Sequence, residues 1–295
     1  MRLFTLILGL QMAAMAFAQT DVSLFWKKDG KQLTEIKSDK ADLTQKLGHA
    51  GPAVENSWGA ARINVDNNCA IDVYCKQNKG LELRKYQWNS TKQQIDAGAG
   101  FGVFDQNVNV GLGGINLLSG NQIVPLEAHN GREIKVVKGD TCSWVEVISR
   151  GVLYEGDSLD VAVRIFAYNN SRQFDIEAEV LKGRSRNIRF TTGLNYTDAS
   201  VRDDDQSHLS VWEPLVRDGV PDSTFVGKSL IFGTQYWMRQ RSHKVVGTER
   251  LVSILPRKKT RLTILFSSSR DAEINTSDAF FEKAISVKPP KNKKK

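Results

Sequence analysis

The sequence has few of the residues that build metal and redox centres. Of its 295 residues, three are cysteine and four are histidine. No C-x-x-C pair and no Cys/His cluster is present, so no zinc site of ordinary spacing is predicted. The G-x-S-x-G and H-E-x-x-H motifs are also missing, and with them two common signatures of hydrolytic enzymes. We predict no metal site, and the sequence leaves the identity of any cofactor open.

Long apolar runs are missing as well, apart from a short one at the N-terminus. Met1-Arg2 precedes an apolar run over residues 3–10, and Ala16-Phe17-Ala18 stands before Gln19. This order is typical of a cleavable secretory signal, and the run is too short to span a bilayer. We predict that residues 1–18 are a signal peptide, that the mature chain has no transmembrane segment, and that it is periplasmic or secreted. A buried N-terminal helix is the alternative.

The folded part of the chain also lacks a strong positive charge. The net charge is +8, but removing Arg2 and the five lysines of residues 288–295 leaves about +2 for residues 19–287. A nucleic-acid-binding protein would carry its positive charge on the folded part, so we expect no nucleic-acid partner. Residues 288–295 are predicted to be a disordered basic tail. The sequence does not indicate an oligomeric state.

The three cysteines leave two possibilities open in an oxidising compartment. Cys69 and Cys75 lie six residues apart on one predicted strand, about 20 Å from each other at ~3.3 Å per residue. That distance is too long for a disulfide. Either all three thiols are free, or Cys142 pairs with one of the other two.

The residues that are present indicate an all-β protein. Short alternating runs, separated by turn signals such as Asn67-Asn68 and Asn130-Gly131, predict a large antiparallel β-sandwich or barrel over residues 19–287 as a single domain. One amphipathic helix is predicted over residues 278–285. The glycines of residues 96–120 lack the strand-to-helix setting of a dinucleotide or phosphate loop. We expect them at bulges and close strand contacts. The main predicted strands are residues 60–66, 70–74, 133–137, 144–148, 159–166, 174–180, 188–190, 228–232 and 261–266.

The stretch from Leu47 to Asn56 carries the best candidates for chemistry. It combines His49, a Gly-Pro turn and Glu55 at the entry to a strand, a place where sites are often built. His49 is a candidate general base, with Glu55 as its acid/base partner. The alternative is a structural turn in which His49 caps the backbone and Glu55 pairs with Arg62.

Polar residues share one face of the next two predicted strands. Arg62 lies on the first, and Asp72, Tyr74 and Lys76 lie two residues apart on the second. This is either the solvent face of a sheet or, if the sheet borders a cleft, a binding face that suits an anionic sugar. Candidate aromatic platforms for a sugar ring are Trp58, Trp88, Trp144, Trp212 and Trp237, with Tyr86 and Tyr236. Of these, Trp144 reads as core, and Trp88, Trp212 and Trp237 stand in the loop-like or polar contexts that suit a platform better. The acidic run of residues 203–205 is either a solvated loop or a calcium site.

A family resemblance adds to these residues. The run Gly48-His49-Ala50-Gly51-Pro52-Ala53-Val54-Glu55-Asn56, the following Arg62, the segment Ile71-Asp72-Val73-Tyr74-Cys75-Lys76 and the glycine-rich block ending Gly113-Gly114-Ile115-Asn116-Leu117 resemble the domain-of-unknown-function family 4861. The resemblance covers roughly residues 45–285. It implies a secreted bacterial protein linked to polysaccharide utilisation, with a galactose mutarotase-like supersandwich fold. The family pattern maps onto His49, Glu55, Arg62, Asp72, Tyr74 and Lys76.

Residues and resemblance together give three functional hypotheses. The first is a protein that acts on uronate-containing, pectin-like or ulvan-like oligosaccharides as a hydrolase, lyase or epimerase. Its catalytic candidates are His49, Glu55 and Arg62, and its substrate-binding candidates are Asp72, Tyr74, Lys76 and Trp212. The second is a non-catalytic carbohydrate-binding protein that uses the same cleft. The third is an envelope-interaction protein whose basic tail touches anionic surfaces. An acidic oligosaccharide is the expected partner in the first two.

Overall fold

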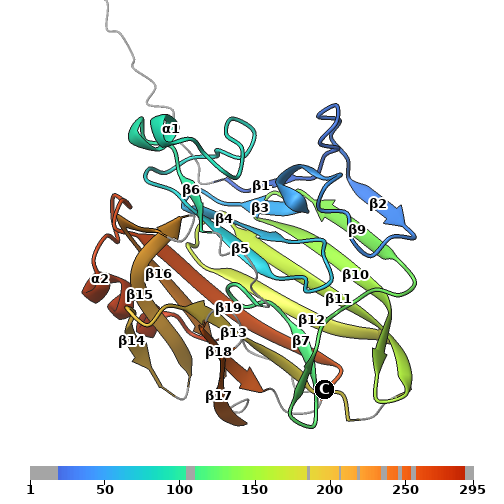
Figure 1. The fold of residues 1–295 in the computed structure, drawn as a ribbon. Helices are drawn as coiled ribbons and strands as arrows, with labels where there is room; N and C mark the ends of the chain where they lie inside the picture. Colours follow the sequence, from blue (N-terminus) through green and yellow to red (C-terminus); the bar gives the residue numbers. More distant parts are fainter. Residues whose placement is uncertain are drawn as a thin grey trace, which may run out of the picture.

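The chain folds into layered antiparallel sheets, seen here in a computed structural model (Figure 1). The structure describes residues 19–289 with gaps at 104–109, 185–186, 206, 218–219, 234–237, 245–247 and 254–256. The predicted signal peptide and residues 290–295 of the predicted tail lie outside the described residues. Within the described part, no helix is long and apolar enough to cross a membrane.

One layer is a nine-stranded sheet in which every neighbouring pair is antiparallel. Along β11, the odd-numbered residues from Leu159 to Ala167 are buried in the core and the even-numbered ones face the other side. The alternation read from the sequence therefore sets which face is apolar. In sheet order, the strands are β14 (Val201–Asp204), β15 (His208–Arg217), β16 (Val220–Ile231), β19 (Lys259–Ser268), β12 (Phe174–Lys182), β11 (Asp157–Tyr168), β10 (Cys142–Tyr154), β9 (Arg132–Val137) and β2 (Glu35–Ser38).

Two five-stranded sheets lie against one face of this layer, and we call them the first and second small sheets. Figure 1 shows them together on the same side of the long strands. The first small sheet has the order β1 (Asp21–Ser23), β3 (Ala53–Glu55), β4 (Gly59–Ile63), β5 (Ile71–Cys75) and β6 (Phe101–Val103). The second has the order β17 (Met238–Lys244), β18 (Thr248–Ser253), β13 (Phe190–Tyr196), β7 (Asn116–Ser119) and β8 (Gln122–Val124).

The glycine-rich segment joins the two small sheets. Gly111 bridges to Ile71 of the first sheet, and Leu112 bridges to Leu194 of the second. Gly111 has a φ of +63°, and a Cβ there would lie 2.1 Å from the Ile71 carbonyl oxygen. Only glycine accepts this conformation at so close an approach. The expected use of these glycines in close strand contacts is confirmed at this position.

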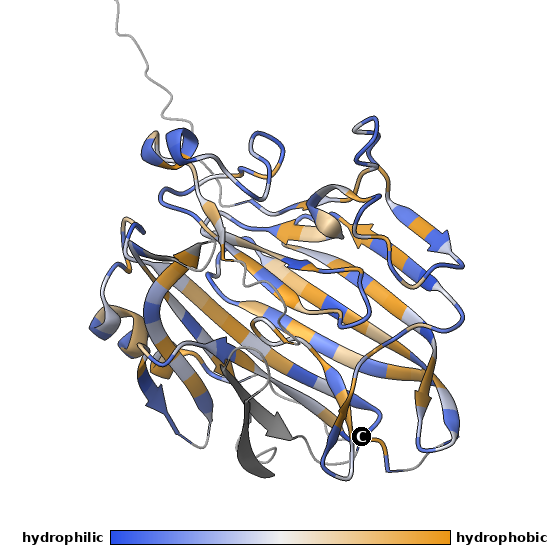
Figure 2. Ribbon diagram, viewed as in Figure 1, coloured by the Kyte–Doolittle hydropathy of each residue, from blue (hydrophilic) through white to orange (hydrophobic). Residues whose placement is uncertain are grey.

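The core runs between the layers and draws on all three sheets. Figure 2 shows apolar and polar bands alternating along the strands. The predicted all-β class with large antiparallel sheets and one short C-terminal helix is confirmed. That helix, α2 (Ser277–Ser286), begins after the N-cap Thr276 and packs on the outer face of the nine-stranded sheet through Phe280 and Ala284. Two shorter helices are α1 (Lys92–Asp96) and the 3-10 turn η1 (Gly48–Ala50).

The polar face of the first small sheet is covered. Residues 77–99 fold over it, and Leu83 and Trp88 of this segment pack on Ala53, Ala60 and Tyr74. The sequence offered an open solvent face or an open binding face here, and neither is present over most of the sheet. A segment that carries its own apolar side chains fills the space that solvent or a ligand would occupy.

The three cysteines are free thiols. Cys69 lies before β5 rather than on it, with a left-handed backbone at φ 52°, so the premise that it shares a strand with Cys75 is wrong. Both side chains are buried. Burial raises the pKa of each of these two thiols, which makes them poor nucleophiles.

Candidate functional site

The loop that carries His49 is held in an unusual backbone conformation. His49 has φ 55° and ψ 17°, and Ala50 also has φ 55°. Left-handed conformations are uncommon for residues other than glycine and cost of order 1 kcal/mol each. A Cβ on Gly51 would lie 2.0 Å from the Ile63 carbonyl oxygen. The loop is therefore pressed against β4, and the strain falls on the histidine that the sequence singled out.

The His49 imidazole is buried without a partner. His49 is 7% exposed, and neither ring nitrogen makes a hydrogen bond of good geometry, although the Leu83 backbone lies close enough to affect its pKa. The ring meets Phe25 edge-on at 5.1 Å and lies 6.0 Å from the Trp88 ring. Burial, followed by the positive charge of Arg62, lowers the pKa of His49 to about 4, partly offset by the Leu83 backbone. The imidazole is neutral at neutral pH and can accept a proton or a hydrogen bond.

His49 opens onto a surface cleft of about 530 Å³, which we call the His49 cleft. Its charged side chains are Arg62 and Lys27, and no acidic side chain lines it in the described part of the chain. Apolar walls with a few convergent polar groups are the usual make-up of a small-molecule site. The lining residues are Phe25, Lys27, Thr44, Gln45, Leu47, Gly48, His49, Ala50, Arg62, Gln87, Trp88 and Asn89.

Arg62 is in the cleft, and its guanidinium is already engaged. Nε and Nη2 donate to Asp72 Oδ2 at 3.0 and 2.7 Å, and Nη1 donates to the His49 carbonyl oxygen at 2.8 Å. The guanidinium carbon lies 4.5 Å from the centre of the Trp88 ring. Arg62 and Asp72 thus hold the His49 loop and Trp88 in place. Asp72 does not line the cleft and acts on it through Arg62. It also accepts a hydrogen bond from Asn64.

Glu55 and Lys76 form a buried ion pair outside the cleft. Lys76 Nζ lies 2.6 Å from Glu55 Oε2 and also donates to the carbonyls of Asn56 and Gly80. The Glu55 carboxylate accepts the backbone N–H groups of Glu82 and Leu83. The contacts to Gly80, Glu82 and Leu83 fasten the covering segment 77–99 to the sheet. The alternative that Glu55 pairs with Arg62 is wrong, because Lys76 takes that place.

Tyr74 and Trp212 also lie away from the cleft. The Tyr74 hydroxyl donates to Glu82 Oε2 at 3.0 Å and contacts Ser90 Oγ at 3.1 Å, beneath the covering segment. Trp212 is on the outer face of the nine-stranded sheet, 7% exposed, with its ring 5.8 Å from that of Phe280 on α2. The structure brings His49, Arg62 and Trp88 together at the cleft, with Asp72 bound to Arg62 and the Tyr74 ring 5.7 Å from that of Trp88, and leaves Glu55, Lys76 and Trp212 out of the cleft. The Trp237 side chain lies outside the described residues.

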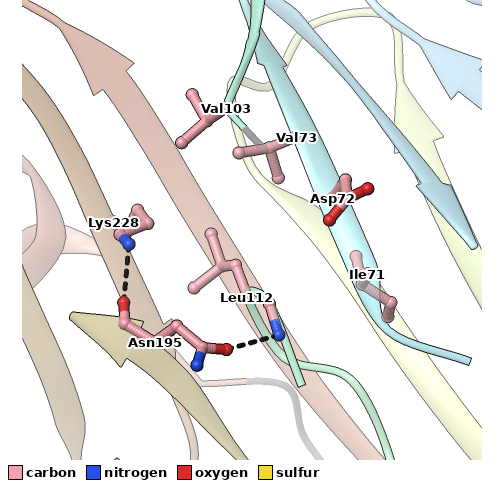
Figure 3. A pocket seen from close by; sticks show the side chains of 8 residues that line it. Ile71, Asp72, Val73, Val103, Leu112, Asn195 and Lys228 are labelled. Carbon is pink, nitrogen blue, oxygen red and sulfur yellow. Dashed lines mark hydrogen bonds between the residues drawn. The ribbon is translucent and has the colours of Figure 1, made fainter. Parts of the chain in front are cut away.

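A second charged cluster lies at the seam between the two small sheets. Lys228 Nζ is 2.5 Å from Glu213 Oε1 and donates to the Asn195 carbonyl oxygen at 2.6 Å. Figure 3 shows the Lys228–Asn195 contact beside the apolar side chains of the pocket. The space is about 20 Å³, room for about one water molecule. The seam can hold a water but not a sugar.

The acidic run of residues 203–205 forms part of a hairpin. Asp205 accepts the backbone N–H groups of Ser207 and His208, and the His208 ring lies between Asp203 and Asp205. No group of three or more metal-ligating side chains is found among the residues that the structure describes. The run therefore contributes hydrogen bonds to the turn of this hairpin.

Much of the cleft came from parts of the sequence with no distinguishing pattern. Phe25 and Lys27 lie in the strand-poor N-terminal segment, Gln45 in a loop, and Gln87 and Asn89 in the covering segment. No motif or alternation marks these residues. The one signal that could have found Gln87 and Asn89 is that they flank Trp88 in the sequence.

Together, the fold and the cleft define an antiparallel β-sandwich protein with a histidine in an aromatic-walled surface cleft. The chain belongs to the family described as "Domain of unknown function (DUF4861)", whose family model matches residues 9–284. A search of curated proteins found no match. Among solved structures, a putative kojibiose phosphorylase from human microbiome is similar, with 8% identity and a TM-score of 0.34. The match covers 86% of this chain and 34% of the phosphorylase, so the chain spans about a third of that protein's length.

Proposed function

We propose that this chain is an exported carbohydrate-active protein that binds uronate-containing, pectin-like or ulvan-like oligosaccharides in the His49 cleft. In this proposal His49 moves a proton, as in a lyase or an epimerase. The observation that carries it is the buried, neutral imidazole of His49, whose nitrogens have no partner and whose ring borders an aromatic-walled cleft. Buried polar groups are normally hydrogen-bonded, so a poorly satisfied imidazole at a cleft supports a role in binding or proton transfer.

The chemistry of the cleft fits such a ligand. Sugar rings have apolar faces that pack on aromatic walls, here Phe25 and Trp88, and hydroxyls that suit the amides of Gln87 and Asn89. Lys27 is the exposed cation on the rim that a uronate carboxylate can meet. In a lyase or epimerase, a base abstracts a proton and nearby positive charge stabilises the carbanion-like transition state. Arg62 places that charge beside His49.

Hydrolysis by two carboxylates is less well supported. That mechanism needs a pair of Asp or Glu side chains on either side of the scissile bond. No acidic side chain lines the cleft in the described part of the chain. Glu55 and Asp72, the two candidates nearest in sequence, are bound in ion pairs with Lys76 and Arg62.

A non-catalytic sugar-binding protein is the second candidate. It is favoured by the low pKa of His49, because a base with a pKa of about 4 is weak. The imidazole would then act as a hydrogen-bond partner for a sugar hydroxyl rather than as a base.

Export is proposed on the sequence, and one contact supports it. Thr20 is the first buried side chain of the described chain, and its hydroxyl meets Ser143 Oγ at 2.7 Å. Gln19 is exposed. Cleavage after Ala18 would therefore leave the packed part of the chain intact.

The test replaces His49 with asparagine, which tolerates left-handed backbone better than most residues. We expect His49→Asn to lower turnover of oligouronides by about a hundredfold or more, measured by the ultraviolet absorbance of unsaturated product and by chromatography for epimers. His129→Asn, at an exposed turn, is the matched control. Full activity in His49→Asn would end the catalytic assignment. Calorimetric binding that His49→Asn weakens, with no product from wild type, would establish the second candidate.

A further inference from the structure

A second cleft lies at the opposite end of the β3–β4 hairpin from His49, and we call it the Trp58 cleft. Its volume is about 340 Å³. Trp58, in the turn between the two strands, forms one wall, and Leu265 and Ile274 form an apolar floor. Nothing in the chemistry proposed above uses it. It is bordered by the loop between β11 and β12 and by the last turn of α2.

The wall of this cleft is rigidly built. Asn56 Oδ1 accepts the Trp58 backbone N–H at 2.9 Å, and Asn56 Nδ2 donates to the Ser171 carbonyl oxygen at 2.8 Å. Arg172 donates to both carboxylate oxygens of Asp271 at 2.7 and 3.0 Å, and its guanidinium carbon lies 5.8 Å from the centre of the Trp58 ring. The turn, the β11–β12 loop and the segment before α2 are thus locked together. Such preorganisation lowers the entropic cost of binding.

The polar groups of the cleft suit a sugar. Asn170 and Gln173 place amide side chains on its lining, and Lys283 of α2 adds an exposed cation that has no ion pair in the described part of the chain. The acidic side chain on the lining, Glu273, is paired with Arg172 and Lys79. The half-buried indole of Trp58 has a buried N–H without an acceptor. An aromatic wall over an apolar floor, rimmed by amides, matches the apolar face and the hydroxyl edge of one pyranose ring.

We propose that the Trp58 cleft is a second sugar-binding site, which takes one pyranose ring of a glycan against Trp58. The site stands apart from the His49 cleft, because Trp58 and His49 lie at opposite ends of the same short hairpin. The pyranose comes from either a neutral or an acidic glycan, and Lys283 distinguishes them. Its occupancy does not require that the protein be an enzyme.

The experiment uses the mature chain and two probes, a trigalacturonate and a neutral galactotriose, titrated with calorimetry and with NMR of the tryptophan indole N–H groups. We expect Trp58→Ala to weaken binding at this site about tenfold, as for an aromatic anchor. Trp144→Ala, on β10 and outside the lining of the cleft, is the matched control and should bind as wild type. Lys283→Met should weaken only the trigalacturonate if the glycan is acidic, and neither probe if it is neutral.

Two further variants keep the proposal falsifiable. Asn170→Trp fills the cleft from an exposed rim position, so it should block binding even if Trp58→Ala fails to fold. His49→Asn should leave the Trp58 indole shift on sugar addition unchanged, which separates this site from the His49 cleft. If neither sugar moves the Trp58 indole signal, or if Asn170→Trp titrates as wild type with both probes, the proposal is overturned.

Discussion

His49 concentrates the unusual features of this protein in one residue. It combines left-handed backbone, an imidazole with no partner, and a pKa lowered to about 4. Each feature costs stability, and a protein keeps such costs chiefly where function needs them. Arg62, by contrast, has its donors occupied by Asp72 and the His49 carbonyl. At the residue scale, Arg62 supports the loop, and His49 is the buried polar group at the cleft that is left poorly satisfied.

The lowered pKa of His49 predicts a pH dependence of stability. The unfolded chain takes up a proton near pH 6.5, whereas the folded protein keeps His49 neutral down to about pH 4. Stability from this group is therefore present above pH 6.5 and lost as the pH falls toward 4, by on the order of 2 to 3 kcal/mol. Urea unfolding at pH 7 and pH 4.5 should show that His49→Asn loses less stability than wild type. Equal losses in both proteins would contradict a buried neutral imidazole.

At the scale of elements, the covering segment 77–99 and helix α2 hide what the strands alone would expose. The segment brings Trp88 to the His49 cleft, and the Glu55–Lys76 ion pair fastens it to the sheet. Helix α2 closes the opposite side of the molecule over Trp212. Each of these elements buries a sheet face that the sequence pattern alone indicates as exposed.

The position of Trp212 under α2 predicts a stability effect without a binding effect. Trp212→Ala should lower the free energy of unfolding by about 3–5 kcal/mol, because its ring packs on Phe280. Amide hydrogen exchange should accelerate in α2, while sugar affinity at the His49 cleft stays as in wild type. Phe280→Ala is the companion variant, expected to free the same helix. A Trp212→Phe protein that folds normally but loses sugar binding would restore Trp212 to the binding candidates.

At the scale of the whole molecule, the two small sheets act as one layer. The segment 110–114 ties them through Ile71 and Leu194, and the core continues beneath both. The seam between them is filled by apolar side chains and the Lys228–Glu213 pair rather than by an open channel. The usable clefts therefore lie along the rim of the first small sheet.

Export is a prediction for the whole chain. Expressed with its own leader, the protein should be recovered outside the cytoplasm with Gln19 as its first residue, which intact-mass and N-terminal analysis can establish. Replacing Ala16 and Ala18 with bulky residues should retain the leader, because the cleavage site needs small side chains. A chain lacking residues 2–18 should stay in the cytoplasm. Recovery of unprocessed wild-type protein would count against the signal peptide.

Local sequence patterns predicted the strands and the helix, but they predicted only part of the cleft. The alternation around β4, β5 and β11 and the capped run of α2 depend on residues close in the chain, so they were readable. His49, Arg62 and Trp88 were each marked as candidates, and they do meet. Tyr74 and Lys76 lie on the predicted face, but Tyr74 and the Glu55–Lys76 pair are bound by residues 80–90 of the covering segment. No spacing on a strand indicates which distant segment will cover it.

The sequence by itself determined the all-β class, the faces of the strands and the position of the closing helix, because side-chain periodicity is a local property of the backbone. Tertiary structure alone decided which polar residues find a partner and which do not. Arg62, Glu55 and Lys76 are consumed by ion pairs and backbone contacts, and His49 is left unpaired at the edge of the covering segment. The physical reason is that a buried charge must find its partner wherever the chain supplies one, and that partner is set by packing.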